Sequence, residues 1–187
     1  MMRERAHEQF FKHALDRLPN MESLVNRIIA LAAPCYVANA TPVLAAKVVK
    51  RTHPMDKGLR FLDGRRILGD SKSVEGFVSG ILAGTAVGFA LRWAGLLGVQ
   101  EAFVLSLGTM LGDALGSFVK RRLGIERGNP APLLDQLTFL LVALLLYQLV
   151  YGGLDALTVV ILVLVTPPIH LVTNYFAYKL GLKSKPW

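Results

Sequence analysis

The 187-residue sequence has few of the features that mark a soluble or secreted protein. Cysteine occurs once, at Cys35, which excludes an intramolecular disulfide and a cysteine-built metal site. Only 18% of the residues are charged and 53% are hydrophobic, a balance too apolar for a soluble domain of this length. Acids are the scarcer charge, with 13 Asp and Glu against 21 Lys and Arg. A GxxxxGK[ST] loop is also absent, so the chain has no P-loop nucleotide site.

The hydrophobic residues gather in blocks of about 20, the length that crosses a bilayer core. They predict an all-α integral membrane protein with a single membrane domain over residues 24–187. Residues 1–23 form an extension with an apolar stripe at helical spacing, which predicts a short amphipathic helix. A stretch of mixed charge precedes the first apolar block, so no cleavable signal peptide is expected. Five transmembrane helices are predicted, at about residues 24–50, 74–99, 102–123, 133–151 and 156–180.

Glycine recurs at every fourth residue in the second and third predicted spans. The positions are Gly76, Gly80, Gly84 and Gly88 in the second span, and Gly108, Gly112 and Gly116 in the third. Ridges of small residues allow two helix backbones to approach closely in a membrane. We therefore expect these two ridges to pack against each other.

The third predicted span carries an acid where water should be scarce. Asp113, Ser117 and Lys120 are spaced i, i+4 and i+7, so they share one face of a helix. An ionisable residue inside a membrane helix costs roughly 3 kcal/mol and indicates a functional site. Asp135 follows at the start of the next span, and two carboxylates beside a basic cluster favour a divalent metal and a phosphate-rich ligand. Alternatively, Asp113 pairs with an arginine inside the bundle and only stabilises the fold.

The longest polar connection, residues 50–75, interleaves bases, acids and glycines. Asp63-Gly64 and Gly69-Asp70 are turn signals. Turns that contain glycine expose backbone N–H groups, and a neighbouring Arg or Lys completes a cradle for an anion. The loop is therefore a candidate phosphate-binding element. A solvated basic loop on the cytoplasmic side accounts for the same charges without any ligand.

Two further sets of polar residues lie within predicted spans. Asn39 stands just before Pro42 in the first span, where the prolines Pro34 and Pro42 predict an interruption. His170 and Asn174 share a face of the fifth span at i, i+4. Each is a candidate cavity residue, and each is equally consistent with a local or interhelical hydrogen bond.

The distribution of bases predicts the orientation in the membrane. Loop 50–75, loop 118–132 and the C-terminal tail lie on the same side of a five-helix path, and the positive-inside rule places that side in the cytoplasm. Because the bases lie next to apolar segments, we interpret them as topology signals and contacts to anionic lipid. Neither nucleic acid nor an obligate protein partner is indicated.

Four stretches resemble the CDP-archaeol synthases, archaeal relatives of the CTP-dependent phosphatidate cytidylyltransferases. They are ANATPVL at 38–44, DGRRILGDSKSVEG at 63–76, GDALGSFVKRRLGIERGNPAPLLD at 112–135 and HLVTNYFAYKLGLKSKPW at 170–187. The resemblance covers nearly the whole chain from the first helix onward. It implies a multi-pass enzyme of the cell membrane, with its active site facing the cytoplasm. Such an enzyme joins CTP to an isoprenoid ether lipid phosphate, digeranylgeranylglyceryl phosphate, and releases CDP-archaeol and pyrophosphate.

Together with the residue chemistry, the resemblance implies roles for particular side chains. Asp113, Lys120 and Asp135 are expected to be catalytic, with Asp113 and Asp135 holding Mg²⁺. The residues expected to bind CTP are Asp56, Asp63, Gly64, Arg65, Gly69, Asp70, Lys72, Ser73 and Arg121. Those expected at the lipid phosphate or its cleft are Asn39, Ser117, His170 and Asn174. Bacterial-type enzymes have a second acid where this chain has Thr138, so the number of metal ions stays open.

Two other functions stay open from the residues. A CDP-diacylglycerol synthase that acts on acyl lipid would use the same groups, because the phosphate chemistry is shared. A small polytopic transporter would have polar residues in both halves of the membrane. Here the charged groups concentrate at one end, which favours an enzyme with a closed cavity that faces the cytoplasm.

Overall fold

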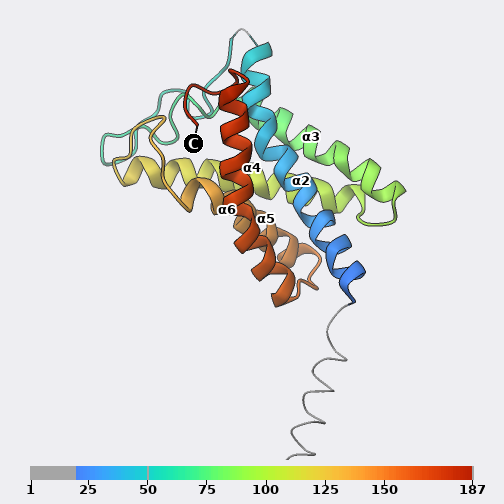
Figure 1. The fold of residues 1–187 in the computed structure, drawn as a ribbon. Coiled ribbons are helices and arrows are strands. Elements are labelled where there is room, and N and C mark those ends of the chain that lie inside the picture. The colour runs from blue at the N-terminus through green and yellow to red at the C-terminus, as the bar shows by residue number, and fades with distance from the viewer. Residues whose placement is uncertain (1–19, 50, 187) are drawn as a thin grey trace, which may run out of the picture.

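The computed structural model describes residues 20–49 and 51–186, which form five α-helices (Figure 1). The helices are α2 Met21–Val48, α3 Val74–Trp93, α4 Val99–Arg122, α5 Leu134–Val150 and α6 Ala156–Lys179. In the described residues, β-structure is limited to two isolated bridges in the α2–α3 loop. The predicted all-α architecture and its five helical segments are confirmed. The predicted N-terminal amphipathic helix lies outside the described residues.

Four helices, α2, α3, α4 and α6, have the length and hydropathy of membrane spans. The remaining helix, α5, is also apolar but has 17 residues. At 1.5 Å per residue it rises about 26 Å, a little less than the roughly 30 Å of a bilayer core. The chain is therefore an integral membrane protein in which one apolar helix is slightly short for a full span.

Glycine ridges bring the helices together, but the two ridges do not face each other. A Cβ atom on Gly112 of α4 would lie 2.4 Å from the carbonyl oxygen of Thr138, so this ridge packs on the backbone of α5. A Cβ atom on Gly80 of α3 would meet the side chain of Met110 on α4 and the carbonyl of Ala38 on α2. The expected pairing of the ridges is wrong, because α4 contacts both α3 and α5 and turns its glycines toward α5.

Helix α2 continues through Pro34 and Pro42, where the sequence predicts an interruption. Pro42 has no N–H group for the carbonyl of Ala38, which is four residues earlier. That carbonyl instead faces Gly80, whose missing side chain leaves room for it. The close approach of α3 therefore accommodates the proline, and α2 stays a single helix.

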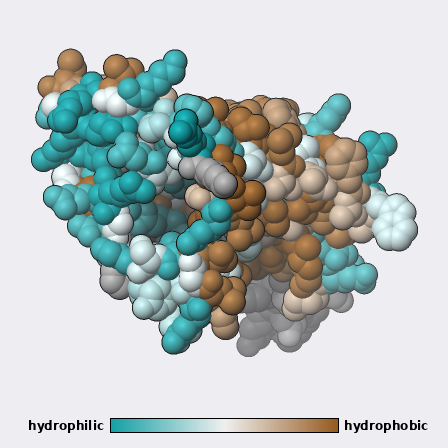
Figure 2. Space-filling model, turned by 90° about the horizontal axis from the view of Figure 1, so that it is seen from above, coloured by the Kyte–Doolittle hydropathy of each residue, from teal (hydrophilic) through white to brown (hydrophobic). Residues whose placement is uncertain are grey.

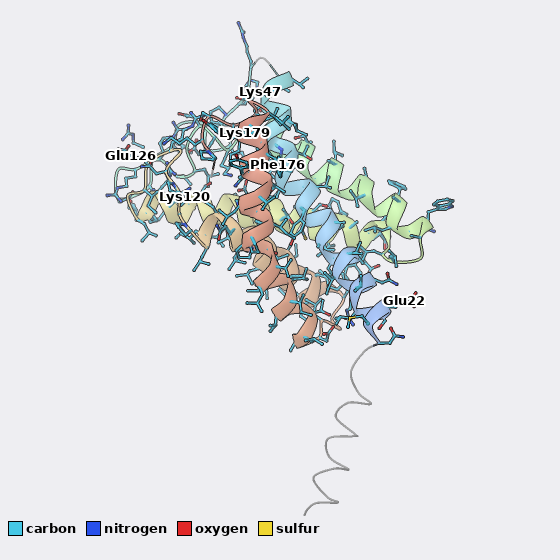
Figure 3. All side chains as sticks on the ribbon, viewed as in Figure 1. Glu22, Lys47, Lys120, Glu126, Phe176 and Lys179 are labelled. Atoms are coloured by element: carbon cyan, nitrogen blue, oxygen red, sulfur yellow. The ribbon has the colours of Figure 1, made fainter. Side chains whose placement is uncertain are left out.

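The polar connections gather at one end of the bundle. The α2–α3 loop, the α4–α5 loop and the C-terminal tail lie together in Figure 1, and hydrophilic atoms cluster on one side in Figure 2. Lys47, Lys120, Glu126 and Lys179 lie at this end in Figure 3, and Glu22 lies at the opposite end. The prediction that the two polar loops share one side of the bundle is confirmed.

Candidate active site

A polar cavity of about 490 Å³ opens where these three polar segments meet. Its wall combines residues of both loops and of the tail with residues from helices α2, α3, α4, α5 and α6. The charged, amide and imidazole side chains on the wall are Asn39, Asp70, Lys72, Asp113, Lys120, Arg127, Asn129, Asp135, His170, Asn174, Lys183 and Lys185. Segments from the first to the last helix therefore contribute to one site.

An ion pair between Lys72 and Asp113 lies on this wall. Lys72 Nζ, at the end of the α2–α3 loop, lies 2.5 Å from Oδ2 of Asp113 in α4. The two side chains are only 21% and 26% exposed. Asp113 thus pairs with a lysine from a distant loop and not with an arginine inside the bundle. The contact holds the end of the loop against the membrane helix.

A second ion pair, between Lys120 and Asp135, closes the α4–α5 connection. Lys120 Nζ donates to both carboxylate oxygens of Asp135, at 2.9 and 3.0 Å, and to the carbonyl of Asn129 at 3.0 Å. These bonds use the three N–H groups of the ammonium. Asp135 also accepts a bond of 2.9 Å from the backbone amide of Ala131. The connection is therefore folded around a lysine that is 9% exposed.

Asp56 organises the α2–α3 loop from inside. Its carboxylate accepts two bonds from the Arg66 guanidinium, at 2.6 and 3.2 Å, and further bonds from three backbone amides of the loop. The guanidinium is the main cause that holds the pKa of Asp56 well below its usual range, against the opposing effect of burial. Its side chain is 1% exposed and is not part of the described cavity wall. In this structure Asp56 therefore shapes the loop that presents Lys72.

Asp63, Gly64 and Arg65 fasten the same loop to the end of α4. Arg65 Nη1 donates to the carbonyls of Arg121 and Arg122, at 3.2 and 2.9 Å, where a helix leaves its last carbonyls without helical partners. Asp63 lies 3.2 Å from the Arg122 guanidinium, and its carboxylate accepts from the amide of Arg65 at 3.0 Å. Gly64, in the turn between them, has a φ of 75°. Asp63, Gly64 and Arg65 are not among the described residues of the cavity wall.

The other residues expected to bind CTP divide between the wall and its surroundings. Asp70 and Ser73 lie on the wall. Asp70 pairs with Arg66 at 2.8 Å, and the Ser73 hydroxyl caps α3 by accepting from the amide of Gly76 at 3.1 Å. Gly69, in the loop, and Arg121, near the end of α4, are not among the described residues of the wall.

The residues expected at the lipid side lie mainly on α6. Asn174 Nδ2 is 3.1 Å from His170 Nδ1, and Lys183 Nζ donates to Asn174 Oδ1 at 3.0 Å. Asn39 of α2 lines the same region of the wall, whereas Ser117 is not among the described wall residues. The helical face that Ser117 shares with Asp113 and Lys120 is therefore only partly open to the cavity.

A second hollow, of about 200 Å³, leads away from the polar cavity between α2, α5 and α6. Its wall is mostly apolar and includes Val43, Leu44, Phe139 and Ile169. We call it the apolar cleft. It shares six wall residues with the polar cavity, so the two spaces adjoin. Those residues are Asn39, Val43, His170, Asn174, Leu182 and Lys183.

The acids on the wall suit a metal ion that arrives with a phosphate ligand. Within the described chain, no three His, Cys, Asp or Glu side chains group into a self-sufficient metal site. The cavity does bring Asp113 and Asp135 to a common wall. Mg²⁺ is usually held by one or two carboxylates together with substrate phosphates and waters. This pair of acids therefore fits Mg²⁺ if phosphate oxygens supply the other ligands.

Sequence reasoning did not single out Arg127, Lys183 or Lys185, all of which lie on the wall. The composition of the tail indicates only a membrane interface. The tail instead returns to the cavity, because Gly181 adopts a φ of 69° just after α6. The amide of Leu182 then bonds the carbonyl of Ala177 at 2.8 Å, a helix-ending turn that favours glycine. The glycine after α6 is the signal that could have indicated this reversal.

The comparisons with known proteins agree on one family. A family model described as CarS-like, CDP-archaeol synthase, matches residues 21–187. A CDP-archaeol synthase of Thermofilum pendens is 50% identical, over 87% of this chain and 81% of that protein. One from Pyrobaculum calidifontis is 51% identical, over 86% of this chain and 97% of that protein. A solved structure, described as an intramembrane enzyme for archaeal membrane lipids biosynthesis, has a TM-score of 0.71 and 43% identity, over 78% of this chain and 91% of that chain. The chain belongs to the CDP-archaeol synthase family.

Proposed function

We propose that this protein transfers CMP from CTP to digeranylgeranylglyceryl phosphate, which gives CDP-archaeol and pyrophosphate. One observation carries the proposal: a basic polar cavity adjoins an apolar cleft between membrane helices, and the two share part of their walls. The reaction requires both spaces, because it joins a highly charged nucleotide to a lipid with two hydrophobic tails. Family membership supports the same reaction.

The chemical step is a substitution at phosphorus. An oxygen of the lipid phosphate attacks the α-phosphorus of CTP and forms a new P–O bond. The bond between the α-phosphorus and its bridging oxygen breaks, and the electron pair leaves with pyrophosphate. The attacking oxygen is already anionic at neutral pH, so no strong general base is required. The protein must mainly supply position and positive charge.

We assign the CTP phosphates to the part of the cavity near Lys72. An ammonium group has three N–H donors, so Lys72 can bond a phosphate oxygen while it keeps its contact with Asp113. Lys120 directs its donors to Asn129 and Asp135 and therefore acts through its charge and by positioning the carboxylate. Arg127 adds a further positive charge to the same wall.

Asp113 and Asp135 are the residues that would hold Mg²⁺ beside the CTP phosphates. When bound, the ion supplies neutralisation of charge on the phosphates during transfer. The structural support is that each carboxylate is already held in place by a lysine on the common wall. Little conformational entropy is therefore lost in ordering these acids when the nucleotide binds.

The α2–α3 loop would cover the nucleotide. Asp70, Lys72 and Ser73 are its wall residues and are the ones we assign to direct contact. Asp56, Asp63 and Arg65 would act on CTP indirectly, since they hold the loop together and attach it to α4. Gly64, Gly69 and Arg121 belong to the same supporting set.

The lipid tails would lie in the apolar cleft, with the lipid phosphate at its polar end. Asn39, His170 and Asn174 line both spaces and mark this boundary. Deeper in the cleft, the Tyr36 hydroxyl and the Thr166 hydroxyl are 2.7 Å apart and connect α2 to α6. The polar end of the protein would face the cytoplasm, where CTP is available and where the positive-inside rule places basic loops.

The decisive experiment incubates the purified protein with Mg²⁺, radiolabelled CTP and a panel of lipid phosphates, and measures label that becomes lipid-soluble. We expect product with digeranylgeranylglyceryl phosphate, and little with Asp113→Asn as the matched inactive control. Efficient use of diacyl phosphatidic acid in preference to the isoprenoid ether would indicate CDP-diacylglycerol synthesis. The absence of lipid-soluble cytidine with every lipid phosphate would refute the proposal.

A further inference from the structure

The boundary between the polar cavity and the apolar cleft carries a single formal charge. We call this boundary the junction and define it by the six shared wall residues named above. Among these six residues of the described chain, the only Lys, Arg, Asp or Glu is Lys183. Any anionic group that stands at the junction, with its apolar part in the cleft, therefore meets this lysine.

The fold holds Lys183 in place. The tail reverses at Gly181, and the amide of Lys183 bonds the carbonyl of Ala177 at 3.3 Å. The ammonium group then donates to Asn174 Oδ1 at 3.0 Å, and Asn174 in turn contacts His170. His170 lies against Phe139 of α5, with ring centroids 6.1 Å apart. A chain of contacts from α5 through α6 thus fixes the position of the ammonium group at the junction.

Burial and the charged side chains of the cavity wall both act on Lys183. Burial is the main cause that lowers the pKa of Lys183, and the charges of Lys72 and Lys120 lower it further. The carboxylates of Asp135 and Asp113 act in the opposite direction. Three lysines therefore influence one another around a common space. A bound phosphate would relieve their repulsion and would replace part of the hydration that burial has removed.

We propose that Lys183 binds the phosphate of the lipid acceptor at the junction, and that Asn174 and His170 position its ammonium group. This inference rests on the proposed function, which it deepens by naming the cation on the acceptor side. Lys72 and Lys120 are held by Asp113 and Asp135 on the nucleotide side. Lys183 instead donates to the side-chain amide of Asn174, at the boundary between the two spaces.

The test compares Lys183→Ala, Lys183→Gln and Lys183→Arg with the parent in purified full-length protein. Glutamine removes the charge but keeps an N–H donor for Asn174. Lys179→Ala is the matched control, because Lys179 lies on the same helix end, stacks on the Tyr175 ring 5.6 Å away and lines neither space. For each protein we would measure the KM for lipid phosphate at saturating CTP, and the Kd for CTP by calorimetry.

Loss of a charge-assisted bond should raise the KM for lipid phosphate about tenfold or more in both Lys183→Ala and Lys183→Gln. The Kd for CTP should change less than about twofold, Lys183→Arg should retain most of the parental KM, and Lys179→Ala should match the parent. A normal lipid KM in Lys183→Gln would reduce Lys183 to a tether for the tail and overturn the proposal. An equal loss of CTP affinity would assign the lysine to the nucleotide instead.

A binding measurement separates this inference from the proposed function. A short-chain dialkylglycerol phosphate and the corresponding phosphate-free alcohol would be titrated into each protein without CTP. We expect Lys183→Gln to weaken only the phosphate ligand, because the apolar cleft is unchanged. This result can be obtained even if the parent makes no cytidine lipid. Equal binding of both ligands in parent and variant would contradict the role of Lys183 whether or not turnover occurs.

Discussion

Lys72 and Asp113 form an ion pair of 2.5 Å between a polar loop and a membrane helix, although 41 residues separate them in the chain. The lysine is on the element that we assign to CTP, and the acid is one of the two that would hold Mg²⁺. The pair therefore couples the position of the nucleotide loop to the metal-binding wall. It also stabilises a carboxylate that would be costly in an apolar helix without a partner.

The first prediction concerns this pair. Lys72→Met should weaken CTP binding about tenfold or more, because a charge-assisted bond to phosphate is lost. Asp113→Asn should mainly lower kcat. Calorimetric titration of CTP with Mg²⁺ measures the first effect, and Lys57→Met is the control, since Lys57 is an exposed lysine of the same loop that is not on the described wall. Unchanged CTP affinity in Lys72→Met would show that the lysine serves only to hold Asp113.

The second prediction concerns the metal. Asp113→Asn and Asp135→Asn should each remove most turnover, and their combined effect should be far from additive, because either change disables one unit. Chelation of Mg²⁺ should abolish activity in the parent. Glu126→Gln is the control for charge, since Glu126 is exposed in the α4–α5 loop and is not on the described wall. Initial rates over a Mg²⁺ titration provide the measurement. Two modest losses that simply add in the double variant would indicate that the acids act separately.

The third prediction concerns the stability of the α2–α3 loop. Because the folded state depresses the pKa of Asp56, its ion pair contributes fully above the usual carboxyl pKa of about 4 and is lost as the pH falls further. Asp56→Asn should open the loop at neutral pH, since the amide loses the charge-assisted bonds from the Arg66 guanidinium. Limited proteolysis of the loop measures this opening. Asp70→Asn is the comparison, because that partner of Arg66 is 57% exposed. Equal protease resistance in Asp56→Asn and the parent would contradict the structural role.

The sequence allowed the central site to be predicted because its signal is local. Helical periodicity places Asp113 and Lys120 on one face, and the short connection to the next helix brings Asp135 to the same wall. The polar loop was also recognisable from its glycines and alternating charges. The supporting role of Asp56 was not predictable. It depends on the path by which the loop folds back over its own carboxylate, and composition does not encode that path.

Long-range packing limited the remaining expectations. Nothing in the spacing of Gly80 or Gly112 indicates which neighbour each ridge meets, because every small-residue ridge fits any close backbone. Lys183 lies beyond Lys179, the last residue of the helix that includes His170, and its return to the cavity depends on the turn at Gly181. The Arg65 contacts arise in the same way, from the meeting of the α2–α3 loop with the distant end of α4.

The last prediction concerns orientation. In a Cys35→Ala background, single cysteines at Leu62, Glu126 and Gln100 should report on the two polar loops and on the opposite end of the bundle. Leu62 and Glu126 should react with a membrane-impermeant maleimide from the cytoplasmic side, and Gln100 should react only from the other side. The ion pair of Asp63 with Arg122 ties the α2–α3 loop to the end of α4, where the α4–α5 loop begins, so the two loops must share one side whatever the orientation. The positive-inside rule then places this side in the cytoplasm, because the α2–α3 loop and the α4–α5 loop are rich in Lys and Arg. Labelling of Leu62 and Glu126 from opposite sides would contradict the fold itself, whereas labelling of both from outside would leave the site intact and refute only the cytoplasmic assignment.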